Sequence, residues 1–423
     1  MIQTAEQALS FIHSCNKFGG KKDDLARMRT LLKTLGSPER LYPVVHIAGT
    51  NGKGSTAAIS ARILECAGYR TGLFTSPFLV RFNERIRVNG AEIPDSQLVR
   101  LCETVRAACE IVVAEGFAHP LEFEVVTALG FLYFAQQKVD IAVVEVGIGG
   151  LLDSTNVVDP AVCAITPIGF DHTRILGGTI EEIAAQKAGI IKENRPVVLS
   201  QQAFPEAADT VRRAAAEKHA EVLETAPFPC TFHRNGLTMP DGTTLSIAGE
   251  HQAINLACAL GIVEALQKQG FAISEDAVRR GIETARWDGR CQWLDDRFLI
   301  DGAHNAAGAK VLCDYLSRFV LPEKITLLYA AMRDKDISAC VRQLAPLCAR
   351  VVTTDIMPVR GESCEALCER FRAQGVRDVT AVSDPKAALA LCRDLAKRDG
   401  GIAVACGSLY LAGFVLGEKE RGN

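Results

Sequence analysis

The chain has 423 residues, which suggests about two to four domains and a core large enough to fold without disulfide bonds. It is 48% hydrophobic and 23% charged, and this composition excludes wholesale disorder. The 47 Lys and Arg residues nearly balance the 50 Asp and Glu residues, so neither nucleic acid nor an anionic membrane is expected as a partner.

No stretch approaches the roughly 20 apolar residues that span a bilayer. The N-terminal segment has no signal-peptide pattern, so we expect a cytoplasmic protein. The 15 cysteines are scattered, and no C-x-x-C pair occurs. We therefore expect reduced thiols that fill small apolar spaces, in preference to a zinc site.

In the first part of the chain, short β-branched runs alternate with amphipathic segments, which is typical of parallel α/β proteins. Thr179 and Glu182 have the spacing of a capping box and predict a helix start. The pattern predicts strands at residues 42–48, 140–146 and 161–165 and a helix at 54–67.

Between residues 227 and 247, short alternating runs broken by Arg-Asn-Gly and Pro-Asp-Gly predict small antiparallel hairpins, and a helix follows at 250–267. A second α/β series then predicts strands at 298–301, 325–332, 350–356, 378–382 and 401–407. We expect residues 1–287 to form a domain with a parallel-rich sheet and small antiparallel hairpins. Residues 288–423 should form a smaller, Rossmann-like α/β domain.

The segment HIAGTNGKGST (46–56) joins a predicted strand to a predicted helix through a glycine-rich turn. Backbone N–H groups in such a turn, with the positive end of the helix, form a cradle for phosphate. Lys53 brings positive charge to the phosphates, and the Ser55 hydroxyl suits Mg²⁺. The segment therefore predicts a P-loop ATPase domain, with nucleotide contacts from Thr50, Asn51, Gly52, Lys53, Gly54, Ser55 and Thr56.

The spacing is not the common G-x-x-x-x-G-K-[ST], because Gly54 separates Lys53 from Ser55. GTNGKGS is the form found in ATP-dependent ligases of the Mur ligase superfamily. The chain most resembles the folylpolyglutamate synthase and dihydrofolate synthase branch of that superfamily. Further ordered motifs carry the resemblance nearly end to end, at residues 75–90, 145–158, 171–192, 288–290, 301–305 and 406–413.

From the residues alone, Glu145 at a strand end suits a magnesium ligand or a salt bridge, and a lone His172 is more often packed than ligating. The resemblance implies that Mg²⁺ is held by Ser55, Ser76, Glu145 and His172. It also implies a carbamate on Lys187 that binds a second Mg²⁺ ion. The family has Glu before this lysine, where this chain has Gln186.

The resemblance likewise implies ATP contacts outside the phosphate loop. It places Asn255 near the adenine, Arg290 and Asp301 at phosphate and ribose, and His304 at the next ATP-site position. Without the resemblance, Asn255 is a solvent-facing helix residue and Asp301 a helix N-cap.

Candidate substrate residues lie in three segments. Arg81, one of three arginines between 81 and 87, suits a glutamate carboxylate. The resemblance places Phe123 and Asp153 at the pteridine ring, as a stacking partner and a hydrogen-bond partner, although core packing explains Phe123 equally well. Phe78 and Leu151 replace a His and an Arg of the family pattern.

The resemblance implies an amide ligase that adds L-glutamate to folates, and also to dihydropteroate, through an acyl phosphate. ATP and two Mg²⁺ ions are the expected cofactors, and Lys53, Glu145, His172 and Lys187 the expected catalytic residues. We expect a monomer with small-molecule substrates only. The alternatives are a monofunctional folylpolyglutamate synthase, a peptidoglycan-precursor Mur ligase, or an ATP-binding regulatory protein without catalysis.

Overall fold

The computed structural model describes residues 1–16, 25–357 and 359–422, which form two compact units. The first unit comprises Met1–Ile168, Leu176–Pro227 and Ile254–Ala285. The second comprises Gly169–Ile175, Phe228–Ala253 and Arg286–Asn423. Within the described residues, no helix is both long and apolar enough to cross a bilayer.

The first unit is built on an eight-stranded sheet in the order β4-β3-β2-β5-β1-β6-β7-β8. The six strands β2, β5, β1, β6, β7 and β8 run parallel to one another. At one edge, β3 pairs antiparallel with β2, and β4 pairs antiparallel with β3. The strands are β1 (Val44–Ala48), β2 (Thr71–Phe74), β3 (Ile86–Val88), β4 (Ala91–Glu92), β5 (Ile141–Glu145), β6 (Val162–Ile165), β7 (Val197–Ser200) and β8 (Val222–Thr225).

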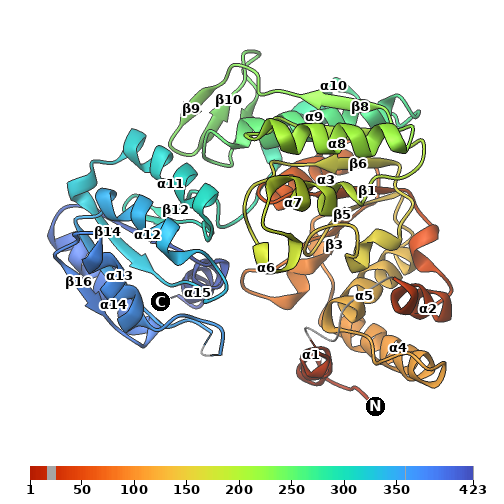
Figure 1. Cartoon of the computed structure of the whole chain (residues 1–423), viewed down its shortest axis with the longest axis horizontal. Helices are drawn as coiled ribbons and strands as arrows, with labels where there is room; N and C mark the ends of the chain where they lie inside the picture. Colours follow the sequence, from red (N-terminus) through yellow and green to blue (C-terminus); the bar gives the residue numbers. More distant parts are fainter. Residues whose placement is uncertain (17–24, 358, 423) are drawn as a thin grey trace. The chain divides into compact units, whose positions relative to one another are not determined.

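Helices cover both faces of this sheet (Figure 1), and the central strands β1, β5 and β6 are buried throughout because both faces are packed. The α-helices are α1 (Ala5–Ser14), α2 (Ala26–Thr34), α3 (Lys53–Cys66), α4 (Asp95–Ala114), α5 (Glu122–Gln136), α7 (Ile180–Ala188), α8 (Pro205–Glu217), α9 (Gln252–Gln267) and α10 (Glu275–Thr284). Short 3₁₀ turns occupy η1 (Pro38–Arg40), η2 (Phe82–Arg85) and η3 (Ser154–Val157).

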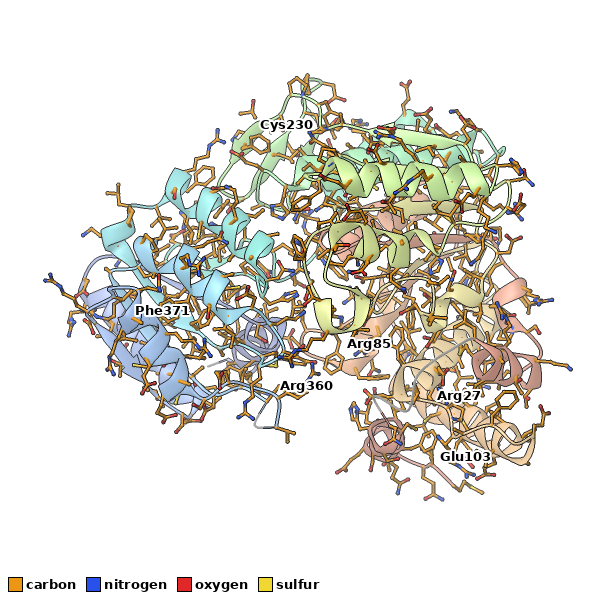
Figure 2. All side chains as sticks on the ribbon, viewed as in Figure 1. Arg27, Arg85, Glu103, Cys230, Arg360 and Phe371 are labelled. Atoms are coloured by element: carbon orange, nitrogen blue, oxygen red, sulfur yellow. The ribbon has the colours of Figure 1, made fainter. Side chains whose placement is uncertain are left out.

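The second unit holds a six-stranded sheet, β12-β13-β17-β14-β15-β16, in which only β12 is antiparallel, and a three-stranded antiparallel sheet, β11-β10-β9. Phe371 is fully buried against Tyr329 of β14, with ring centroids 5.1 Å apart (Figure 2). The strands are β9 (Thr231–His233), β10 (Gly236–Thr238), β11 (Thr244–Leu245), β12 (Gln292–Asp295), β13 (Phe298–Ile300), β14 (Ile325–Tyr329), β15 (Arg350–Thr353), β16 (Val379–Ala381) and β17 (Ile402–Cys406). The helices are α6 (Thr173–Leu176), α11 (Ala306–Phe319), η4 (Pro322–Lys324), α12 (Ile337–Leu344), η5 (Ala345–Leu347), α13 (Cys364–Ala373), α14 (Pro385–Arg398) and α15 (Leu409–Glu420).

The three-stranded sheet packs on the C-terminal sheet and its helices through Arg234. Its guanidinium lies 3.6 Å from the Trp293 ring, and the Tyr315 hydroxyl donates to its carbonyl at 2.5 Å. These contacts explain why residues 228–253 group with the C-terminal residues. We predicted one domain boundary, between residues 287 and 288. The compact units change at 285–286, and two earlier segments, 169–175 and 228–253, also belong to the second unit.

The α/β class and the parallel-rich sheet are confirmed, as are the predicted strands β1, β5, β6 and β13 to β17 and the hairpins of residues 227–247. The capping box is confirmed, since Thr179 Oγ1 accepts from the Glu182 amide at 3.2 Å and the Glu182 carboxylate accepts from the Thr179 amide at 3.1 Å. Strands β2, β3, β4, β7, β8 and β12 were not predicted. In β12 the residues are only partly buried, so the strand lacks an apolar run.

All 15 cysteines are free thiols, and most are buried. Burial raises the pKa of Cys163 and that of Cys392 to about 12.

Helices α3 and α10 pack at Gly281, where an added Cβ would lie 2.5 Å from Ile63 Cα. We expect Gly281→Ala to lower the free energy of unfolding by about 1–3 kcal/mol through overpacking, despite the better helix propensity of Ala. Gly178→Ala is the control, because nothing lies within 4 Å of its added Cβ. Equal urea midpoints for the two variants would contradict this account of the α3–α10 contact.

Candidate active site

The glycine-rich loop joins β1 to α3 as predicted, and Gly52 is the N-cap of α3 with φ +87°. Gly52 has no side chain with which to cap this helix, and a helix N-terminus that follows a glycine-rich turn suits an anion. An added Cβ at Gly52 would lie 2.1 Å from Asn255 Oδ1, which places Asn255 of α9 directly against the loop. The amides of Thr50 and Asn51 instead donate to the Pro167 carbonyl, at 3.0 and 3.2 Å.

Two lysines from different helices meet this loop. Lys53 Nζ donates to the Thr50 carbonyl at 3.1 Å and lies 4.0 Å from Glu145 Oε1. Lys187 is only 4% exposed, and its Nζ donates to the Gly49 carbonyl at 2.7 Å. Lys187 is therefore buried next to the loop, although its position on a helix alone predicts an exposed side chain.

The oxygen donors predicted for Mg²⁺ in the first unit follow three adjacent strands, β2, β5 and β1. Glu145 ends β5, is buried, and accepts the Ser76 amide at 3.1 Å after β2. The Ser55 hydroxyl is buried and makes no hydrogen bond within the described part of the chain. A carboxylate and a hydroxyl with an unused lone pair suit a hard divalent cation, so these residues fit Mg²⁺.

His172 belongs to the second unit, whereas Ser55, Ser76, Glu145 and Lys187 belong to the first. His172 has φ +51°, and its amide donates to Asp171 Oδ1 at 2.8 Å. Lys335 Nζ donates to the same oxygen at 2.6 Å and lies 3.2 Å from His172 Nε2. Lys335 was not predicted, because it stands in an unremarkable charged loop, MRDKD.

Asp171 also gathers the predicted nucleotide residue His304. His304 Nε2 lies 3.6 Å from Asp171 Oδ2, and the Asn305 side chain donates from Nδ2 to that oxygen at 3.1 Å. Burial of Asp171 opposes its ionisation, but hydrogen bonding with His304 and the charge of Lys335 outweigh burial and hold its pKa well below the usual range. Asp171 is thus a fixed anion that orients its neighbours.

Asp301 joins two loops of the second unit and does not cap a helix. Its carboxylate accepts the amides of Cys291 and Ala303, each at 2.7 Å, while Asn305 caps α11. Burial raises the pKa of this carboxyl. Arg290 precedes Cys291, and its guanidinium donates to the Gly289 carbonyl at 2.9 Å. The Gly302 amide donates to the same carbonyl at 2.8 Å, so the DGR and DGAHN motifs lie side by side.

The predicted substrate residues have different surroundings. Phe123 is partly buried, its ring centroid 6.1 Å from that of Phe74, and packs on the core. Arg81 is 58% exposed and lies 3.6 Å from the Asp95 carboxylate. Asp153 is buried, and its carboxylate accepts four hydrogen bonds from its own loop, which was not predicted.

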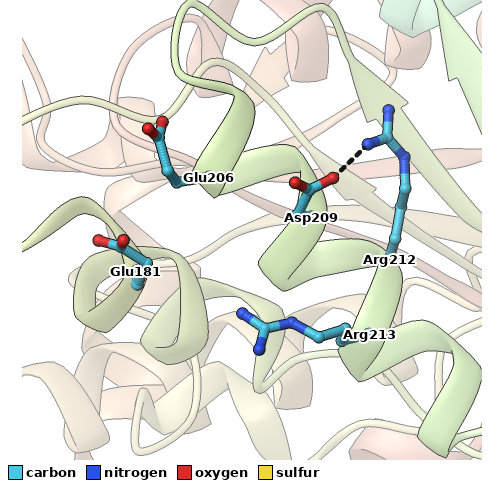
Figure 3. Close-up of a pocket in the computed structure, with 5 residues that line it drawn as sticks. All are labelled: Glu181, Glu206, Asp209, Arg212 and Arg213. Atoms are coloured by element: carbon cyan, nitrogen blue, oxygen red, sulfur yellow. Dashed lines mark hydrogen bonds and ion pairs between the residues drawn. The ribbon is translucent and has the colours of Figure 1, made fainter.

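A hollow between α7 and α8 lies apart from these residues (Figure 3). Its lining is charged, and Arg212 pairs there with Asp209 at 2.7 Å. None of the predicted site residues lines it; its residues are Glu181, Glu206, Asp209, Arg212 and Arg213.

Comparisons with known proteins identify the family of the chain. Residues 47–263 match the Mur ligase middle domain, and residues 289–409 match the Mur ligase glutamate ligase domain. The chain is an ATP-dependent ligase of the Mur ligase family.

Within that family, it is 39% identical to a dihydrofolate synthase/folylpolyglutamate synthase of Bacillus subtilis over 81% of this chain and 83% of the relative. A folylpolyglutamate synthase of Mycobacterium tuberculosis complexed with ADP superposes with a TM-score of 0.92 at 30% identity, covering 99% of this chain and 98% of that one. An FPGS–AMPPCP–folate complex superposes with a TM-score of 0.84 at 32% identity, covering 99% and 100%. The chain belongs to the folylpolyglutamate synthase/dihydrofolate synthase family.

The fit of Gly52 against Asn255 gives a test of the phosphate loop. We expect Gly52→Ala to weaken ATP binding at least about 10-fold, because the new Cβ meets Asn255 and Ala disfavours a φ of +87°. Gly68→Ala is the control, since it shares a positive φ, +94°, but has nothing within 4 Å. Calorimetric titration with ATP measures both; equal affinities would exclude the steric account.

His46 of β1 is fully buried, and burial together with the charge of Lys192 lowers its pKa to about 3. In the unfolded chain the His46 imidazole binds a proton at about pH 6.5, whereas in the folded chain it stays neutral down to about pH 3. Stability therefore falls as pH falls through this window, by about 1.4 kcal/mol per pH unit for this group. Urea unfolding between pH 7 and 4.5 should show a shallower loss for His46→Gln than for the unmodified protein, and parallel losses would contradict the assignment.

Proposed function

We propose that the protein joins the amino group of L-glutamate to a carboxylate of a folate, with conversion of ATP to ADP and phosphate, and that it accepts dihydropteroate as well. The observation that carries the proposal is the convergence of Lys53, Lys187 and Glu145 on the phosphate loop. The end-to-end similarity to an FPGS–AMPPCP–folate complex supports the choice of substrates. A small-molecule site, a monomer and a cytoplasmic location complete the proposal.

A carboxylate does not condense with an amine in water unless it is activated. In the proposed reaction a carboxylate oxygen attacks the γ-phosphorus of ATP, the bond to ADP breaks, and an acyl phosphate forms. The free amine of glutamate then attacks the acyl carbon, loses a proton, and expels phosphate. This sequence needs positioned substrates and charge stabilisation but no nucleophilic side chain.

Lys53 is placed to neutralise the phosphoryl oxygens, and the N–H groups at the start of α3 to bind them. We assign Arg290, Asp301 and His304 to ATP contacts from the second unit, with Asn255 near the adenine. Mg²⁺, when bound, supplies alignment and charge neutralisation for the phosphates. Ser55, Ser76, Glu145 and His172 would hold it, and a carbamate on Lys187 would serve a second ion.

On the substrate side, we assign Phe123 and Asp153 to the pteridine ring and Arg81 to a glutamate carboxylate. The exposure of Arg81 leaves it accessible to a ligand. A peptidoglycan-precursor substrate is the alternative, and a regulatory ATP-binding protein is disfavoured by the retained Lys53, Glu145 and Lys187.

The test offers ATP, Mg²⁺ and L-glutamate with dihydropteroate in one tube and tetrahydrofolate in another. Mass spectrometry should show one added glutamyl unit, with matching ADP release, in both tubes; product in one tube assigns a single activity. Glu145→Gln should lower the rate about 100-fold, because a neutral amide is a poorer ligand than a carboxylate for the Mg²⁺ that would align the phosphates. Glu206→Gln, the same change on exposed α8, is the control. No product in either tube, with ATP still bound, would overturn the folate assignment and direct the assay to muramyl substrates.

A further inference from the structure

A buried polar side chain interrupts the apolar centre of the first unit. His46 lies in the middle of β1, opposite Val144 of β5 and Cys163 of β6, and is completely buried. Its Nε2 lies 2.8 Å from Thr155 Oγ1, and its Nδ1 has no hydrogen-bond partner within the described residues. Burying an imidazole with one nitrogen unsatisfied costs stability. A role for the hydrogen bond between Nε2 and Thr155 would explain why a histidine occupies this position.

The chain of hydrogen bonds from His46 has one direction. Thr155 Oγ1 lies 2.5 Å from Asp153 Oδ1, and an ionised carboxylate only accepts, so the single hydroxyl proton goes to Asp153. The Thr155 oxygen must then accept from His46. Nε2 therefore carries a proton, and because burial lowers the pKa of His46 and keeps the imidazole neutral, Nδ1 carries none.

The far end of the chain is the turn that follows Glu145. Asp153 Oδ2 accepts the amides of Gly147 and Ile148, each at 3.0 Å. The Phe123 ring lies against Gly147, where an added Cβ would be 2.6 Å from the ring. The orientation of this turn therefore determines both the path of the backbone after Glu145 and the position of the Phe123 ring.

The same loop is fastened at a second point. The Asn156 side chain donates to the carbonyls of Leu151 and Gly189, at 2.9 and 3.0 Å, and the Leu151 amide donates to Gln186 at 2.7 Å. These bonds tie the loop to the end of α7, next to Lys187. His46 links this network to β1, the strand that leads into the phosphate loop.

We propose that His46 is a positioning residue of the ligase: through Thr155 and Asp153 it fixes the turn at residues 147–148 and thereby the folate-side surface formed by Phe123. The inference rests on the proposed function for its kinetic consequence, but not for its structural one. His46 itself touches no substrate. It is thus expected to act on the affinity for folate and to leave the affinity for ATP nearly unchanged.

Four variants of the whole 423-residue chain test the relay. His46→Met and Thr155→Val each remove one link at similar volume, the double variant combines them, and His46→Gln keeps an amide N–H donor. We expect each single variant to raise the KM for tetrahydrofolate about 10-fold while the KM for ATP changes less than about 2-fold. The double variant should be no worse than either single one, because both break the same chain, and His46→Gln should recover most of the loss.

Amide hydrogen exchange at Gly147 and Ile148 gives a readout that is independent of substrate. Exchange should be faster in His46→Met and Thr155→Val and close to normal in His46→Gln. If the exchange rates change in this way but the unmodified protein adds glutamate to neither dihydropteroate nor tetrahydrofolate, the proposed function fails and the relay stands. If the unmodified protein is active and the variants alter only melting temperature, raise both KM values equally, or combine additively, the relay is overturned.

Discussion

The main chain of the phosphate loop lies closer to its neighbours than any side chain allows. An added Cβ at Gly49 would be 1.8 Å from Thr166 Oγ1, and one at Gly52 would be 2.1 Å from Asn255 Oδ1. The loop is therefore held between the end of β6 and helix α9, and its carbonyls at Gly49 and Thr50 stand where two lysines can reach them. Because this fit fixes the positions of the backbone dipoles, the charges around the loop need no large rearrangement to meet a phosphate chain.

In the second unit the largely buried carboxylate of Asp171 has a similar organising effect. Asp171 is desolvated, which costs free energy, and Lys335, His304 and Asn305 compensate by charge and hydrogen bonds. Asp171 opens the motif at 171–192 but was not predicted as a site residue, yet it orients His172 and His304.

The sequence allowed much of the fold to be predicted because the central strands are apolar on both faces and the phosphate loop has a distinctive composition. The partly exposed β12 lacks that pattern, and a pairing such as Arg234 with Trp293 depends on tertiary structure that no local window contains. At the site, the positions of Lys53 and Ser55 follow from the loop itself. The burial of Lys187, the hydrogen bonds of Asp153 and the presence of Lys335 depend on residues far away in the chain, so local spacing could not predict them.

The free cysteines divide between the two units, with Cys102, Cys163 and Cys258 in the first and Cys340, Cys392 and Cys406 in the second. Each of these thiols is buried, and burial raises its pKa, so the reactive thiolate is scarce while the fold is intact. Reaction with a thiol reagent therefore requires local or global opening of the unit that contains the cysteine. The rates at which a thiol reagent modifies the buried cysteines of each unit would therefore report how often that unit opens. Comparing these rates with and without nucleotide would show whether binding slows the opening of one unit, the other, or both.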